Sequence, residues 1–143
     1  MLTFTADQIA RAAGVTTSSA HRLGDRLGAP RIGAGGSVTD RQHRPFTLGQ
    51  WITARLLREC QQPGGDRTRH WIADVLVAQA PARLDEQLAR WLVVQHGEIH
   101  LVDEQHELTR MLCDPANAGA TTVVFDLARA LADCPNPPPL NRG

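Results

Sequence analysis

The spacing of hydrophobic and polar residues divides the 143-residue chain into helical and extended segments. Two segments, at 4–8 and 46–50, begin in the same way: a phenylalanine precedes a threonine, and a glutamine follows three residues later. This is the pattern of a capping box with a hydrophobic staple. It predicts one helix that begins near Ala6 and another that begins near Leu48.

The first of these helices is expected to be followed directly by a second. Gly14 ends it, because glycine adopts the left-handed conformation of a helix C-terminus without steric cost. Thr16 is the predicted cap of the next helix. The interior positions of the pair are small or apolar residues, namely Ala10, Gly14, Val15, Ala20 and Leu23. A helix, a glycine turn and a second helix predict a helix-turn-helix unit.

Further helices follow in the middle of the chain. The helix from Leu48 to about Cys60 has an apolar face, and 61–66 is a clear break rich in proline and glycine. The pattern predicts an amphipathic helix over about 68–79 and a separate short helix from Pro81, since proline is allowed in a first turn. We expect these helices to pack on the first unit.

The last third changes from helical to extended spacing. Residues 91–95 and 98–102 are apolar, β-branched runs separated by His96 and Gly97, a plausible two-residue hairpin turn. Asp103 is the predicted cap of a helix that reaches about Cys113. A loop over 115–120, a strand over 121–125 and a helix over 126–132 complete a ββαβα order.

These elements predict the α+β class and four regions. They are a winged helix-turn-helix domain at 1–62, connecting helices at 67–90, a small α+β interaction or dimerisation unit at 91–134, and a disordered tail at 135–143.

Charge is distributed unevenly although the net formal charge is zero. Residues 1–70 contain ten arginines and five acids, and residues 71–143 contain five arginines and ten acids. Such asymmetry points to a basic binding face joined to an acidic partner region. Every basic residue is arginine, which suits phosphate and guanine contacts, but the same bias also follows from a GC-rich genome.

The stretch 31–45 has three glycines in four positions, Gly33, Gly35 and Gly36. It lacks the third glycine of a dinucleotide fingerprint and the lysine of a phosphate-binding loop. A hairpin fits its flanks better, because short extended runs lie on both sides of the glycines. A hairpin directly after a helix-turn-helix is typical of the wing of a winged helix.

Two segments then carry a resemblance to a known family. Gly14-Val15-Thr16-Thr17-Ser18-Ser19-Ala20 is similar to the turn and recognition-helix start of MerR-type winged helix-turn-helix proteins, and 43–51 (HRPFTLGQW) is similar to the end of their wing. Pro30-Arg31 falls where the family opens the wing. The resemblance covers about residues 4–60 and implies a DNA-binding domain.

The candidate DNA contacts follow from these two regions. The second helix would enter the major groove and the wing would hold the phosphate backbone. The candidate residues of the second helix are Thr16, Thr17, Ser18, His21 and Arg22. Those of the wing are Arg31, Arg41 and Arg44. The alternative for the helix is an ordinary solvated face.

Other kinds of site find little support. His96, His100 and His106 occur near Asp103, Glu104, Glu107 and Cys113, but no pair of histidines four residues apart lies on a predicted helix, so we expect no metal. No catalytic constellation is evident, and we expect neither enzyme activity nor a cofactor. Cys60, Cys113 and Cys134 suggest no disulfide framework and are expected to be small buried hydrophobes. Without a signal-peptide pattern or a membrane span, the chain is expected to be cytoplasmic.

The leading hypothesis is a sequence-specific DNA-binding protein, a transcriptional regulator with double-stranded DNA as its partner and a homodimer or protein contact through the C-terminal half. Two alternatives stay open. One is an excisionase-like or architectural DNA-binding protein of a mobile element. The other is an antitoxin or adaptor-type protein-interaction module, in which the acidic half does the main work.

Overall fold

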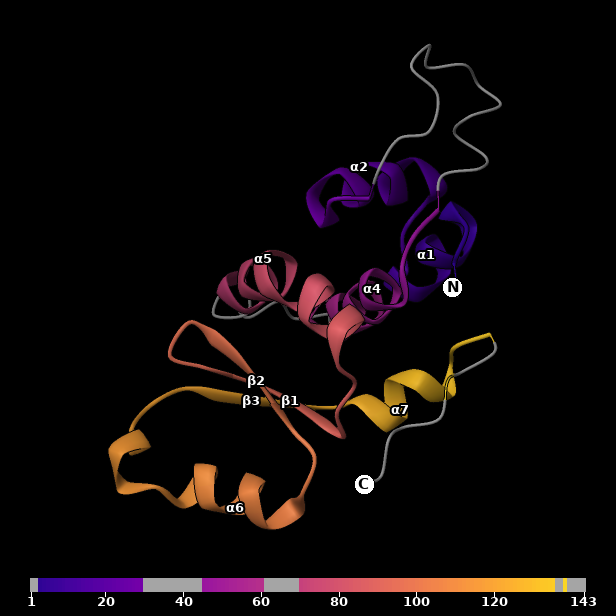
Figure 1. Cartoon of the computed structure of the whole chain (residues 1–143). Helices are drawn as coiled ribbons and strands as arrows, with labels where there is room; N and C mark the ends of the chain where they lie inside the picture. Colours follow the sequence, from indigo (N-terminus) through magenta and orange to yellow (C-terminus); the bar gives the residue numbers. More distant parts are fainter. Residues whose placement is uncertain (1–2, 30–44, 61–69, 136–137, 139–143) are drawn as a thin grey trace.

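The computed structural model describes residues 3–29, 45–60, 70–135 and 138. It has a mixed α+β fold, in which four helices precede a three-stranded antiparallel sheet with short helices (Figure 1). The helices are α1 (Ala6–Ala13), α2 (Thr17–Leu27), α4 (Leu48–Cys60) and α5 (His70–Glu86). The rest comprises β1 (Trp91–Gln95), β2 (Glu98–Val102), α6 (Gln105–Cys113), the 3-10 turn η2 (Pro115–Asn117), β3 (Thr122–Asp126) and α7 (Leu127–Ala132).

The two predicted helix starts are confirmed, and they lie side by side. In each one the threonine side chain accepts a backbone bond from the glutamine, whose side chain accepts one from the threonine N–H. Phe4 and Phe46, the residues before the two threonines, pair through backbone bonds of 2.9 and 3.0 Å. Both phenylalanines are buried, and the Phe4 ring stacks on Trp51. The repeated pattern therefore joins α1 to α4.

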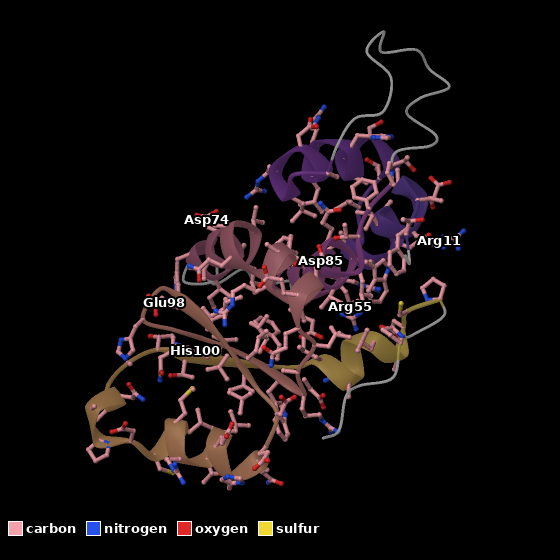
Figure 2. The ribbon with its side chains drawn as sticks, in the orientation of Figure 1. Arg11, Arg55, Asp74, Asp85, Glu98 and His100 are labelled. Atoms are coloured by element: carbon pink, nitrogen blue, oxygen red, sulfur yellow. The ribbon has the colours of Figure 1, made fainter. Side chains whose placement is uncertain are left out.

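Helix α4 is the central helix of the fold. It buries residues on almost all of its sides, because α1 packs on one face and α5 on another. Helix α5 approaches α4 closely at Gly49, where the Pro81 carbonyl oxygen occupies the space of an added Cβ. There the Asp85 carboxylate accepts the Gly49 N–H at 2.7 Å, at the positive end of the α4 dipole (Figure 2).

The prediction of two helices over 68–79 and from Pro81 is wrong. A single helix, α5, runs from His70 to Glu86 with Pro81 inside it. Proline removes one helical N–H bond. Here Pro81 is buried where α5 meets Gly49, so tertiary packing favours the continuous helix over the break that proline alone would cause.

The sheet has the strand order β2-β1-β3. The predicted hairpin is confirmed: Gln95 pairs with Glu98, and His96 and Gly97 both have positive φ, 54° and 72°. One face, with Leu92, Val94 and Phe125, joins the core beneath α4 and α5, and α6 lies on the opposite side of the sheet (Figure 1).

Other boundaries of this region differ from the prediction. Asp103 does not cap α6; Glu104 occupies the cap position and makes no side-chain cap bond. The expected loop after Cys113 contains η2, where the Asp114 side chain accepts the Ala116 N–H. The final helix is capped by Asp126, as its position before Leu127 suggests.

The cysteines do not share one environment. Only Cys134 is buried, and burial raises the pKa of its thiol, whereas Cys60 is half-buried and Cys113 is exposed. The expectation that all three are buried hydrophobes is therefore wrong for Cys113. Among the described helices, none combines the length and the apolar character needed to cross a membrane.

Candidate nucleic-acid interface

The turn between α1 and α2 is fixed by backbone bonds. Gly14 has φ 70°, and the Val15 N–H bonds the Ala10 carbonyl at 3.0 Å, which closes the C-terminus of α1. Ala10 and Ala20 are buried between the helices, and Val15 and Leu23 are half-buried against the same core. The predicted interior of this helix pair is therefore confirmed for Ala10 and Ala20 and in part for Val15 and Leu23, whereas the prediction is wrong for Gly14, which is exposed.

Two of the candidate hydroxyls hold α2 in place. Thr16 is the N-cap: its Oγ1 accepts the Ser19 N–H at 3.2 Å and donates to the Ser19 hydroxyl at 3.1 Å. The Thr17 hydroxyl donates to Asp7 Oδ1 at 2.9 Å, which connects α2 to α1. Thr16 and Thr17 are exposed, but their hydroxyls already have partners, so their first role is to orient α2.

The outer side of α2 presents a different pair. Ser18 and Arg22 are both exposed and are four residues apart, so they lie next to each other on one helix face. His21 is half-buried at the margin of this face. Arg26 lies 3.7 Å from Asp74 of α5. Figure 1 shows α2 at the end of the molecule away from the sheet. We call Ser18 and Arg22 the α2 outer face.

The remaining predicted contacts cannot be placed beside this face. Arg31, Arg41 and Arg44, with the expected wing except Pro45, lie outside the described residues. Pro45 directly precedes Phe46, whose pairing with Phe4 fixes where the chain re-enters the fold.

Two further arginines near the turn were not predicted. Arg58 of α4 packs against Gly14, where an added Cβ would lie 3.5 Å from the Arg58 Cγ. Arg11, in the last turn of α1, is exposed and projects outward (Figure 2). Both are basic residues near helix C-termini, which is a common electrostatic preference and gave no functional signal in the sequence.

A second region with polar side chains lies between α6 and the β1–β2 hairpin. It is an open cleft of about 500 Å³ that includes His96, His100, Glu107 and Arg110. His96 Nε2 lies 3.0 Å from the Asn117 side-chain oxygen. Its lining combines acidic, basic and neutral side chains.

The predicted histidine cluster is only partly formed. His106 lies 3.0 Å from Glu104, and these two residues with Glu107 have ligand atoms within 4.8 Å of one another. All three are exposed, and His96 and His100 line the cleft instead. Exposed acidic groups of this kind are ordinary on protein surfaces.

Comparison with known proteins gave no assignment. No family model, curated protein or solved structure matches this chain significantly. The α2 outer face therefore has to be interpreted from its own chemistry.

Proposed function

We propose that this protein binds double-stranded DNA, with α2 as the helix that enters the major groove. The observation that carries the proposal is the α1–turn–α2 unit, which leaves Ser18 exposed in the first turn of the second helix and Arg22 exposed one turn later. In helix-turn-helix proteins the N-terminal residues of the second helix contact base edges.

The side chains of the α2 outer face suit this role. An arginine can donate two parallel bonds to guanine O6 and N7, and a serine hydroxyl can bond a phosphate or a base edge. We assign the guanine contact to Arg22 and a contact with the neighbouring phosphate or base edge to Ser18. Arg11 and Arg58, close to the turn, supply positive charge where a neighbouring phosphate would lie.

The finer proposal is a MerR-like winged helix that acts as a transcriptional regulator. It is supported by the similarity of residues 14–20 and 43–51 to that family and by the excess of arginine in residues 1–70. In this proposal the wing at 31–45 grips the backbone through Arg31, Arg41 and Arg44, and the C-terminal half binds a partner.

The test is a pair of arginine variants with the same change of charge. Arg22→Ala should weaken binding to a selected DNA site by about tenfold, a loss of one specific base contact, and should relax sequence preference there. Arg110→Ala, on exposed α6, should leave binding unchanged. Genomic fragments selected by the full-length protein supply the site, and gel shifts measure affinity.

The salt dependence of binding separates base contact from phosphate contact. Arg44→Ala should weaken binding to all sequences and lower the slope of log affinity against log salt by about one. No DNA binding at low salt would refute the proposal. A DNA bend with weak sequence preference would favour the architectural alternative over a regulator.

A further inference from the structure

The two edges of the sheet differ in whether side chains of the described residues bond their outward backbone groups. On the β2 edge, the Gln79 side chain accepts the Ile99 N–H at 3.1 Å and donates to the Gly97 carbonyl at 2.9 Å. Arg83 Nη1 donates to the Ile99 carbonyl at 2.6 Å. Side chains of α5 therefore occupy backbone groups that another strand would need at this edge.

On the β3 edge, by contrast, the direction of the backbone groups follows from the register of the hairpin. Because the hairpin loop has two residues, Gln95 and Glu98 exchange backbone hydrogen bonds. From there along β1 and β2, hydrogen-bonded pairs alternate with pairs that are not hydrogen-bonded. The backbone groups of Leu92 and Val94 consequently point to β3, where they meet Phe125 and Val123.

The intervening residues of β3 are Thr122, Val124 and Asp126. Thr122 and Val124 direct both backbone groups away from the sheet, whereas Asp126 directs only its N–H there, because the carbonyl of this N-cap residue accepts the first bond of α7. Among the described residues no strand lies beside them. The β3 edge, defined by these three residues, therefore presents a row of alternating donors and acceptors.

Side chains on the β3 edge favour a particular occupant. Val124 is 38% exposed, one of two large hydrophobic side chains that are exposed in the described part of the chain. Thr122 Oγ1 accepts a bond from Gln95 Nε2 at 2.8 Å, which leaves the Thr122 hydroxyl hydrogen to donate. Asp126 uses Oδ1 to accept from Ala128 and Arg129 N–H groups, which leaves Oδ2 to accept.

We propose that two copies of this chain associate by antiparallel pairing of their β3 edges, which joins their sheets into one of six strands. Val124 faces Val124 of the second copy across the two-fold axis. Thr122 then faces Asp126 of the second copy, and its hydroxyl donates to Oδ2 of that carboxylate. In this register all three outward residues have a facing residue. The Val124 pair exchanges two backbone bonds, and in each Thr122–Asp126 pair the Asp126 N–H donates to the Thr122 carbonyl.

The edge is complementary to itself in hydrogen bonding. No like charges face each other in this register, and the central contact is apolar. This inference deepens the part of the proposed function that gives the C-terminal half a partner. It is tested without DNA, so a failure of DNA binding and a failure of self-association are separate results.

The test places charges on the two-fold axis. Val124→Glu sets two carboxylates opposite each other, and Val124→Lys sets two ammonium groups opposite each other. Each variant alone should raise the dimer dissociation constant by at least about tenfold, and an equimolar mixture should restore the dimer. Ala82→Glu and Ala82→Lys, at an exposed position of α5, are the matched controls and should dimerise like the unaltered chain.

Molar mass is measured by analytical ultracentrifugation across a dilution series of the full-length chain. A dimer that is lost in each Val124 variant and regained in the mixture supports the pairing. A monomer at every concentration, or a dimer that neither charge disturbs, overturns it.

Hydrogen exchange gives a second measurement that needs no variant. The Val124 amide should be protected in concentrated protein and should exchange rapidly on dilution. The Phe125 amide, which is directed to β1, should stay protected in both. Equal, concentration-independent exchange at Val124 overturns the proposal.

Discussion

At the scale of single residues, small side chains determine how closely the helices approach. Gly49 and Gly28 illustrate two different reasons for glycine. Gly49 is needed for space, since the Pro81 carbonyl occupies the place of its Cβ. Gly28 has φ 80° and no atom within 4 Å of an added Cβ, so it is needed only for its backbone conformation at the end of α2.

These two positions should respond differently to the same substitution. Gly49→Ala should lower the free energy of unfolding by about 3 kcal/mol, because α5 must move away from α4. Gly28→Ala should cost about 1 kcal/mol, the strain of a left-handed alanine. Urea denaturation of both variants measures the difference. Equal losses would mean that the α4–α5 contact is looser than described.

At the scale of elements, the two capping boxes have the same sequence pattern and different surroundings. Within the described part of the chain, Gln8 bonds only inside its own box at an exposed helix start. Gln50 is buried, and its Nε2 also donates to the Leu27 carbonyl at 3.2 Å, where α2 ends. The second box therefore connects two helices as well as capping one.

Removing each glutamine should separate these roles. Gln8→Ala should cost about 1 kcal/mol, the worth of a helix cap. Gln50→Ala should cost about 1–3 kcal/mol more, because the Leu27 carbonyl loses its buried partner. Thermal and urea unfolding of the two variants give the comparison. A Gln50 variant as stable as the Gln8 variant would show that the bond to Leu27 contributes nothing.

At the scale of the whole molecule, the core is continuous from the N-terminal helices to the sheet. Buried residues from Phe4 to Cys134 form one cluster, and α4 lies at its centre. Arg55 of α4 adds a polar link, with its Nε 2.8 Å from Asp133 after α7 and only 12% of its side chain exposed (Figure 2). Opposite charges of the two halves thus meet where the largely buried Arg55 reaches the exposed carboxylate of Asp133.

This continuity predicts the behaviour of a truncated chain. Residues 1–62 alone should remain largely unfolded, because α4 would expose the apolar surface that packs on α5. The full-length chain should unfold in one cooperative transition. Circular dichroism during heating measures both. A cooperative transition in the 1–62 fragment would instead support an autonomous N-terminal domain.

Local sequence signals were sufficient for most helix and strand starts. Thr5, Thr47 and Gly14 act through atoms within a few residues of themselves, so their roles could be predicted without the rest of the chain. Pro81 could not, since its place inside α5 depends on a contact with α4. The exposure of Ser18 and Arg22 could be predicted from their helical spacing. The hydrogen bond from the Thr17 hydroxyl to Asp7 could not, because it joins two different helices.

The sequence by itself determined the local elements: two capped helix starts, a glycine turn, a two-residue hairpin and an uneven distribution of arginine. The helix starts, the turn and the hairpin depend on backbone geometry and on hydrogen bonds between near neighbours, and the distribution of arginine is a property of the sequence itself. Only the tertiary structure decided that α5 is unbroken, that Gln50 reaches α2, and that side chains of α5 cover the β2 edge while no strand of the described residues lies beside β3. Such features depend on side chains that are far apart in sequence and become neighbours when the core is buried.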